Sequence, residues 1–410
     1  WIEVGDPRLL VRAARHYEGA VGECISLCVK SCAVGTAEPE APLPMCTWVV
    51  CESPCRIDLA GGWTDTPPIC YEHSGGGIVI NAAITVGGRC PIGAKSRRIP
   101  RPVVRISIDD GASYLEYEQL TGLTDYNSPL APGALPKCVL LFCGLVSLNG
   151  GEGPGLAEQL EAQGGGIEVQ SWSRLPTGSG LGTSSILAGA LVCCVGRAMG
   201  RAYSAECLTH AVLQVEQMLT TGGGWQDQAG GILPAIKRCT SAPTLPLAVE
   251  SLVLPIPPRH IELLNAHLTL VYTGKTRLAR NLLQDVLRRW YSANPAILAN
   301  VHGLVANAEA MQSALLRGDI AAVGVCLDTY WAQKKMMCDA EPEVVTRMLT
   351  KVRPLVHGAT LAGAGGGGFM LLITKEPHAG AAVAAALCDE QIELHDAAID
   401  PKGLRVSLSP

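Results

Sequence analysis

The chain has 410 residues, of which 48% are hydrophobic and 17% are charged, and its formal net charge at pH 7 is −5. This length suggests two or three domains, and the hydrophobic fraction is ample for a packed core. The net charge is negative and the sequence contains no cluster of basic residues, so the composition argues against nucleic-acid binding. The apolar runs are also far shorter than the about 20 residues of a membrane helix.

Glycine and cysteine are the unusual residue types, with 46 and 17 copies. No Cys-X-X-Cys pair occurs, and the cysteines lie in apolar runs. This pattern is typical of reduced thiols that pack as small hydrophobic side chains, so we expect a cytoplasmic protein.

The first segment, residues 1–44, predicts a long helix and a proline-rich linker. Asp6 can cap the helix, Pro7 suits its first position, and apolar residues recur at helical spacing to about Val34. Prolines then recur over residues 36–44, as in a semi-rigid linker. Since the chain begins at Trp1 rather than Met, we interpret this segment as the end of an upstream domain.

Two lobes with mixed strands and helices are predicted to follow, over residues 45–258 and 259–410. The hydrophobic patterns predict strands at 48–51, 55–59, 79–86, 103–108, 167–171, 268–272 and 369–373. They predict helices at 184–199, 204–219, 278–290, 295–317, 319–338 and 379–390, and a proline-rich crossing at 243–258. Because strands and helices do not alternate strictly, the expected fold class is α+β.

A glycine-rich loop from residue 175 to 185 carries the strongest chemical signal. Gly178, Gly180 and Gly182 allow close approach of a ligand to the backbone, and an apolar helix follows. Free amides and the helix dipole favour an anion such as phosphate there. Three hydroxyl side chains could bind phosphate or Mg²⁺, namely Thr183, Ser184 and Ser185. The spacing matches neither GxGxxG nor a Walker A loop, and a plain connection before a capped helix is the alternative.

Other segments carry charges or dense glycine. Arg56 and Asp58 share one face of a predicted strand, and Asp65 follows in a turn that it could simply cap. Glu216 and Asp227 lie 11 residues apart, and either could be a surface charge. Five glycines fall within residues 363–368, which indicates either a close approach or a flexible hinge.

Three segments in this order, 56–65, 176–185 and 361–368, resemble the three motifs of the GHMP kinases. The family's galactokinases have Glu-His where this chain has Gly62-Trp63. The strings at 61–68, 89–95, 273–280 and 330–335 are most similar to the kinase domain of L-fucokinases, and heptose-phosphate kinases are the nearest rival. The resemblance implies a two-lobed fold, with an N-lobe like ribosomal protein S5 domain 2 and a ferredoxin-like C-lobe. It also implies an upstream pyrophosphorylase-like domain.

The resemblance implies roles for particular residues. Asp227 would be the catalytic acidic residue and Arg56 the cation beside it, while Ser184 and Glu216 would bind Mg²⁺. The ATP phosphates would be held by Gly178, Ser179, Gly180, Leu181, Gly182, Thr183, Ser184 and Ser185. The sugar would be held by Gly62, Trp63, Asp65, Gly366 and Gly367.

The predicted reaction is therefore transfer of a phosphoryl group from ATP, with Mg²⁺, to the anomeric hydroxyl of L-fucose. Two alternatives stay open at this point. One is the same chemistry on another sugar, such as galactose or a heptose phosphate. The other is a sensor of sugar or nucleotide on the same fold without catalysis.

Overall fold

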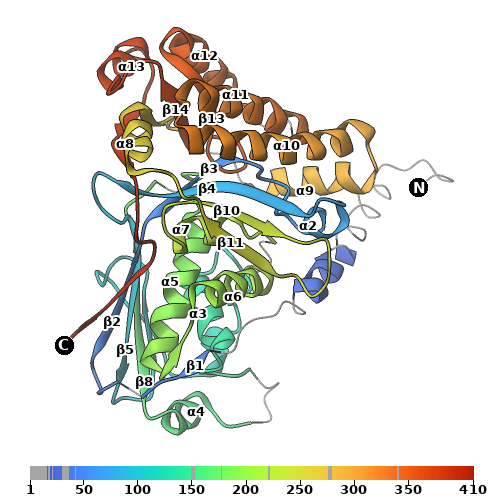
Figure 1. The fold of residues 1–410 in the computed structure, drawn as a ribbon. Coiled ribbons are helices and arrows are strands. Elements are labelled where there is room, and N and C mark those ends of the chain that lie inside the picture. The colour runs from blue at the N-terminus through green and yellow to red at the C-terminus, as the bar shows by residue number, and fades with distance from the viewer. Residues whose placement is uncertain are drawn as a thin grey trace, which may run out of the picture.

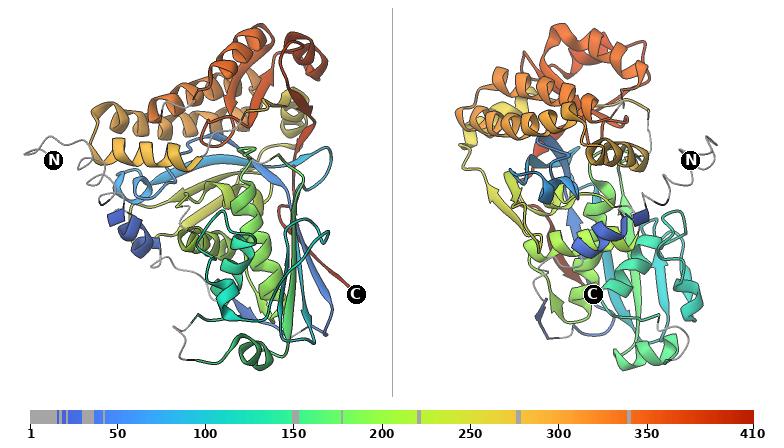
Figure 2. Two further views of the ribbon diagram at one scale, coloured as in Figure 1. Left: turned by 180° about the vertical axis from the view of Figure 1, so that it is seen from behind. Right: turned by 90° about the vertical axis from the view of Figure 1, so that its right-hand side faces the viewer.

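In the computed structural model, the described residues are 16, 19–20, 22–29, 37–41, 43–148, 153–176, 178–219, 222–275, 279–338 and 341–410. Figure 1 shows a lower part, in which sheets and helices pack together, and an upper part, coloured mainly orange to red, that is dominated by helices. The two further views keep the same division (Figure 2). One sheet lies between the two parts, with strands β3 (Cys55–Ala60), β4 (Gly77–Val86), β10 (Ile236–Ser241) and β11 (Val249–Val253).

A six-stranded sheet forms one wall of the lower part, in the order β17-β2-β5-β8-β6-β7. Its neighbours are antiparallel except β6 and β8, which are parallel. The strands are β2 (Trp48–Ser53), β5 (Ile92–Ile99), β6 (Val104–Ser107), β7 (Leu115–Tyr117), β8 (Gly166–Ser173) and β17 (Arg405–Ser409).

Four helices and a short 3-10 helix accompany this sheet. They are η1 (Leu120–Leu123), α3 (Ala134–Phe142), α4 (Leu156–Ala162), α5 (Thr183–Ala198) and α6 (Ala205–Met218). Helix α5 packs on β2 and β5 and is buried along most of its length. An apolar cluster between these layers contains Val49, Val169, Leu191 and several cysteines, among them Cys138 and Cys194. The cysteines therefore contribute to the core as small hydrophobic side chains.

A second sheet runs in the order β11-β10-β4-β16, with β3 also paired to β4. Its strands are β3 (Cys55–Ala60), β4 (Gly77–Val86), β10 (Ile236–Ser241), β11 (Val249–Val253) and β16 (Ala397–Ile399). Two short helices adjoin it, α2 (Ile69–Glu72) and α7 (Gln226–Ile232). Every residue of β3 is buried, so this strand lies deep between the two parts of the molecule.

The upper part contains a four-stranded antiparallel sheet in the order β13-β14-β12-β15. Its strands are β12 (Leu268–Tyr272), β13 (Val356–Leu361), β14 (Phe369–Thr374) and β15 (Glu393–His395). The helices are α8 (Pro258–His267), α9 (Ala279–Tyr291), α10 (Pro295–Arg317), α11 (Ile320–Met337), α12 (Glu343–Val352), η2 (Arg353–Leu355) and α13 (Gly380–Ala386). Helix α11 packs against α10 and β13 and also contacts β3 of the second sheet.

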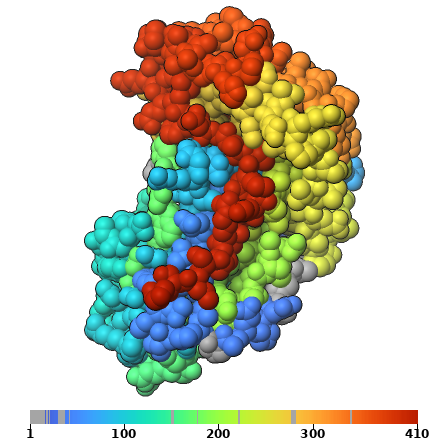
Figure 3. All heavy atoms as spheres, turned by 60° about the vertical axis from the view of Figure 1, so that its left-hand side comes forward, coloured from blue at the N-terminus to red at the C-terminus, as the bar shows by residue number. Residues whose placement is uncertain are grey.

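The end of the chain returns from the upper part to the lower sheets. Strand β16 pairs with β4, and β17 pairs with β2. Figure 3 shows this segment in red, descending across the surface from the upper part to the blue early residues. The division of the chain into lobes at residues 258 and 259 stays a prediction, and by strand pairing these last strands join the sheets of the first half.

Most of the predicted elements are present within a few residues of their expected bounds. The expected helix over residues 6–34 is helical at 16, 19–20 and 22–29, and its other residues lie outside the described ones. In the linker, β1 (Glu38–Pro39) pairs with β9 (Arg201–Ala202). The expected crossing at 243–258 is wrong in part, because β11 lies within it and pairs with β10. Within the described residues, no helix is both long and apolar enough to span a bilayer.

Candidate active site

A cleft of about 520 Å³ opens where the glycine loop before α5, strand β3 and the β13–β14 loop meet. Its walls include residues of four separate segments, represented by Arg56, Ser184, Asp227 and Gly363. All four lie in segments that were predicted from the sequence to carry or adjoin the chemistry. The fold therefore brings together segments that are as far apart in sequence as strand β3 and residue 363.

The glycine loop reaches the cleft with an alternating left-handed backbone. Gly178, Gly180 and Gly182 have φ angles of 71°, 74° and 76°, which side chains with a Cβ rarely adopt. A Cβ on Gly180 would lie 2.7 Å from the carbonyl oxygen of Ala362, and the amide of Phe369 donates to the carbonyl of Ser179 at 2.9 Å. The loop is thus held against the β13–β14 loop and ends at the amino terminus of α5, where amides lack intrahelical acceptors.

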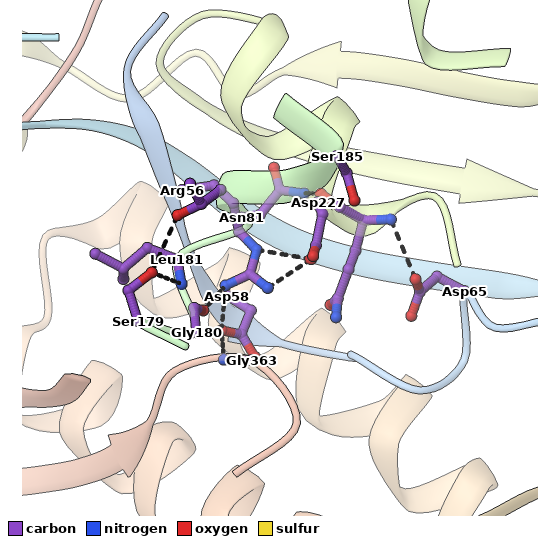
Figure 4. Close-up of polar contacts among 12 residues, drawn as sticks. Arg56, Asp58, Asp65, Asn81, Ser179, Gly180, Leu181, Ser185, Asp227 and Gly363 are labelled. Atoms are coloured by element: carbon purple, nitrogen blue, oxygen red, sulfur yellow. Dashed lines mark hydrogen bonds and ion pairs between the residues drawn. The ribbon is translucent and has the colours of Figure 1, made fainter. Parts of the chain in front are cut away.

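Arg56 and Asp227 form an ion pair beside this loop. The Nε and Nη2 atoms of Arg56 both donate to Oδ1 of Asp227, at 3.0 and 2.5 Å (Figure 4). Only 2% of the arginine side chain is exposed, but 31% of the aspartate side chain is. The aspartate therefore faces the cleft while the arginine anchors it from inside. Burial disfavours the charged guanidinium, yet Asp227 and Asp58 outweigh this and raise the pKa of Arg56.

Asp58 ties that arginine to the upper part of the molecule. Its Oδ2 accepts from the hydroxyl of Tyr330 at 2.8 Å and from Nζ of Lys334 at 2.7 Å. Its Oδ1 accepts from the amide of Gly363 at 2.9 Å and from Nη1 of Arg56 at 3.2 Å (Figure 4). Burial opposes ionisation of Asp58, but Lys334 and Arg56 prevail and hold its pKa below the usual value. We call Asp58, Tyr330 and Lys334 the buried hub.

Two hydroxyls and a carboxylate lie at the start of α5. Ser185 is buried and donates to Oε1 of Glu216 at 2.8 Å, which fixes the carboxylate of α6 against α5. Ser184 is exposed, and all three residues line the cleft. One carboxylate with a nearby hydroxyl suits Mg²⁺, which takes oxygen ligands and completes its shell with water and substrate phosphates. The donor set therefore fits this ion.

Asp65 lies on the far side of Asp227 from Arg56 (Figure 4). Its Oδ2 accepts from the amide of Gln226 at 3.1 Å, whereas its buried Oδ1 has no hydrogen-bond partner among the described residues. Burial, aided by the charge of Asp227, raises the pKa of Asp65 to about 7. An acceptor left open in this way is costly unless a ligand pairs with it.

Comparison with known protein families shows which family this chain belongs to. Residues 155–234 match the GHMP kinases N terminal domain, and residues 311–393 match the GHMP kinases C terminal domain. The chain belongs to the GHMP kinase family. Its fold agrees with this: the crystal structure of a D-glycero-D-manno-heptose 1-phosphate kinase from Bacteroides thetaiotaomicron superimposes with a TM-score of 0.63. That match has 18% sequence identity and covers 88% of this chain and 98% of the other.

Two curated relatives of this GHMP kinase are more similar in sequence. One is the bifunctional fucokinase/GDP-fucose pyrophosphorylase of Arabidopsis thaliana, 34% identical over 79% of this chain and 30% of the relative. The other is the L-fucokinase/L-fucose-1-P guanylyltransferase of Bacteroides fragilis, 34% identical over 87% of this chain and 38% of the relative. The chain thus spans about a third of the length of these relatives.

Most of the residues predicted for the GHMP kinase site do line the cleft, and a few do not. Leu181 is fully buried behind the loop, and Gly62, Gly366 and Gly367 do not line the cleft. In the third glycine segment, Gly363 and Ala364 line it instead. A Cβ on Gly62 would collide with the hydroxyl of Tyr330, so this glycine permits packing of the hub.

Sequence reasoning missed several residues of the site. Tyr330 and Lys334 belong to a string that carried the family resemblance, but no role was assigned to them. Their i, i+4 spacing places both on one face of α11, and a lysine on an otherwise apolar helix face is the sequence signal that could have found it. Gln226 directly precedes the predicted Asp227, although no role was assigned to it. Leu283 carried no such signal, because only the tertiary structure brings it to the cleft.

Proposed function

We propose that this chain transfers the γ-phosphoryl group of ATP to the anomeric hydroxyl of L-fucose, giving L-fucose 1-phosphate. The observation that carries the proposal is the Arg56–Asp227 pair, which faces the same cleft as the amino terminus of α5. Support for fucose comes from the 34% identity to the fucokinases of Arabidopsis thaliana and Bacteroides fragilis.

The amino terminus of α5 would receive the phosphates. Its unpaired amides and the helix dipole attract anions, and the positive φ angles of Gly178, Gly180 and Gly182 keep side chains away from them. Phosphoryl transfer needs mainly positioning and neutralisation of charge, and a rigid loop of this kind contributes the positioning.

Glu216 and Ser184 are the residues that would hold Mg²⁺. The ion, when bound, neutralises charge that develops on the phosphates. The hydrogen bond from Ser185 keeps Glu216 oriented, so the chain's own contribution is a carboxylate fixed before the ion binds.

Asp227 would accept the proton of the attacking anomeric hydroxyl, or orient that hydroxyl for attack. The guanidinium of Arg56 donates twice to one oxygen of this carboxylate, which fixes its orientation toward the cleft. Arg56 also donates to the carbonyl of Gly180 at 2.6 Å, which links the base to the loop that holds the phosphates. One side chain, Arg56, would therefore position both the carboxylate beside the sugar and the loop beside ATP.

A screen of ATP consumption tests the proposal. L-fucose, D-galactose, D-arabinose and a heptose phosphate are supplied separately with ATP and Mg²⁺, and turnover with L-fucose should give the highest kcat/KM. A preference for heptose phosphate would instead favour the chemistry of the heptose 1-phosphate kinase whose fold this chain shares. Binding of ATP without turnover of any sugar would contradict the proposed activity and favour a sensor.

The names of the two curated relatives support one further part of the proposal. Each combines a fucokinase with a second activity on the product, a pyrophosphorylase or a guanylyltransferase. We expect this chain to supply L-fucose 1-phosphate to a domain of that kind in the cytoplasm. Addition of the product and GTP to an enzyme that forms GDP-fucose, with release of pyrophosphate as the readout, tests this.

A further inference from the structure

The part of the cleft beyond Asp227 has two chemically different sides. One side is formed by Asp65 and Gln226, each of which carries a buried oxygen acceptor. The other is an apolar wall made by Trp63, Leu283, Tyr330 and Ala364. We call this region the acceptor end. Most of the wall comes from the upper part, which contributes Leu283, Tyr330 and Ala364, whereas Trp63 lies in the same turn as Asp65, after β3.

The polar side contains two buried atoms that are ready to accept hydrogen bonds. Oδ1 of Asp65 and Oε1 of Gln226 are both buried, and neither has a partner among the described residues. The other carboxylate oxygen of Asp65 accepts a hydrogen bond from the backbone amide of Gln226, which holds the two residues together. Buried acceptors without partners are rare in folded proteins, and hydroxyl groups of a ligand would satisfy both.

The apolar wall faces the same space. Trp63 is 8% exposed and packs in a cluster with Tyr330, Leu282 and Val286, against which Leu283 and Ala364 also pack. Its φ angle of 77° is unusual for a residue other than glycine. The surrounding cluster therefore holds the indole at the cleft, although the turn itself does not favour this conformation.

Together the two sides fit a ligand with hydroxyl donors on one edge and an apolar group on another. We propose that Gln226 and Leu283 make the acceptor end selective for a 6-deoxyhexose, with ring hydroxyls on Asp65 and Gln226 and the C5 methyl group on the wall of Trp63, Leu283 and Ala364. The inference rests on the proposed function, since it assigns the sugar's orientation in that site.

Physical chemistry explains why this arrangement discriminates. A hydroxymethyl group in place of the methyl group would bury its hydroxyl against an apolar wall without a hydrogen bond. Apolar pockets reject such an added hydroxyl only moderately, by about 100-fold. Loss of the hydrogen bond to Gln226, by contrast, would weaken the binding of every sugar that carries the shared ring hydroxyls.

Two sugars that differ only at this position test the wall. L-fucose and L-galactose have the same ring hydroxyls and differ by a methyl or a hydroxymethyl group on C5. The natural chain should prefer L-fucose in kcat/KM by about 10- to 100-fold. In Leu283→Asn this ratio should fall at least tenfold, whereas Leu298→Asn, on the exposed surface of α10, should leave it unchanged.

A second variant tests the polar side. Gln226→Met keeps the length of the side chain and removes the acceptor, so the KM of L-fucose should rise at least tenfold while the KM of ATP and the L-fucose to L-galactose ratio stay the same. Circular dichroism and the thermal midpoint check that both variants fold. Should either fail to fold, Leu283→Thr, which places a hydroxyl on the wall, and Gln226→Leu, which also lacks the acceptor, should give the same two changes.

The outcomes separate this inference from the proposed function. Equal use of both sugars by the natural chain, or an unchanged ratio in Leu283→Asn, would overturn the inference while fucokinase activity stands. A rise in the KM of ATP in Leu283→Asn would assign the wall to the nucleotide and overturn it too. Absence of turnover with any neutral sugar would overturn the proposed function itself.

Discussion

The two ends of the cleft are built in different ways. The phosphate end, formed by residues 178–185 with Glu216, comes largely from one continuous stretch of chain, and part of it is open to solvent. The acceptor end is assembled from five separate stretches, which contribute Trp63 with Asp65, and then Gln226, Leu283, Tyr330 and Ala364. Backbone amides of consecutive residues can form an anion site from one short stretch of chain. A site that selects a sugar by its shape needs side chains from several directions.

The buried hub joins these two ends. Asp58 receives two cations, Arg56 from the same strand and Lys334 from α11, and it also accepts from the amide of Gly363. Lys334 donates in turn to the carbonyls of Leu361 and Gly363 at 2.7 and 3.1 Å. The β13–β14 loop and Arg56 are therefore positioned by one network, and the following variants weaken one end or the other.

The largest effect is expected for Asp227→Ala. Removal of the acidic group beside the attacking hydroxyl should lower kcat by about 10²- to 10⁴-fold, while ATP still binds, because the phosphate end is unchanged. Steady-state kinetics and equilibrium binding of ATP measure the two quantities. Asp389→Ala, an exposed residue paired with Lys351, serves as the control. Turnover near that of the natural chain would show that Asp227 is not the base.

Lys334→Met tests the hub that joins the two ends. It leaves the carboxylate of Asp58 buried with one cation fewer, which should lower the free energy of unfolding by about 3–5 kcal/mol. Urea denaturation measures this, and Lys351→Met, which breaks an exposed pair, should change the midpoint little.

The double variant Lys334→Met/Asp58→Asn should recover part of that loss, since no uncompensated carboxylate remains. If the single variant is as stable as the natural chain, the hub does not support the packing of β3 against α11.

Glu216→Gln acts on the phosphate end alone. The Mg²⁺ concentration for half-maximal rate should rise by about 10- to 100-fold, with the KM of L-fucose unchanged. Glu206→Gln, at the exposed first turn of the same helix, is the matched control. An unaltered titration with Mg²⁺ would remove Glu216 from the metal site.

The last prediction is a gradual pH dependence of stability at the acceptor end. Asp65 has a pKa of about 7 in the fold against a usual value of 3.8, so the folded state holds this proton more tightly than the unfolded state. Its contribution to stability is therefore present below pH 4 and lost as pH rises through about 7, by at most about 1.4 kcal/mol per pH unit.

Asp65→Asn should remove this component, so the difference in unfolding free energy between the two proteins should slope with pH only in that range. Urea melts at pH 5, 6 and 7 measure it. A difference that is flat across these values would show that Asp65 is already ionised in the fold.

The sequence alone was sufficient for the glycine loop before α5 and for much of the secondary structure. Alternating glycines before an apolar run predicted the loop and α5, because close approach of backbone and helix formation both depend on neighbouring residues. The same holds for α10 and α11, whose periodic apolar positions extend over many turns. The strand within 243–258 was missed, because its residues 250–253 are exposed and carry no alternating pattern.

Only the tertiary structure decided how distant charges and apolar groups meet. Nothing near Asp58 in the sequence indicates Lys334, 276 residues later, and nothing near Asp65 indicates Leu283. These contacts depend on the packing of β3 against α11 and on the β13–β14 loop, which chain-local patterns do not encode. The sequence by itself thus determined the family and the local glycine loop. The arrangement of the acceptor end follows instead from long-range packing, where burial determines which charges and apolar side chains face one another.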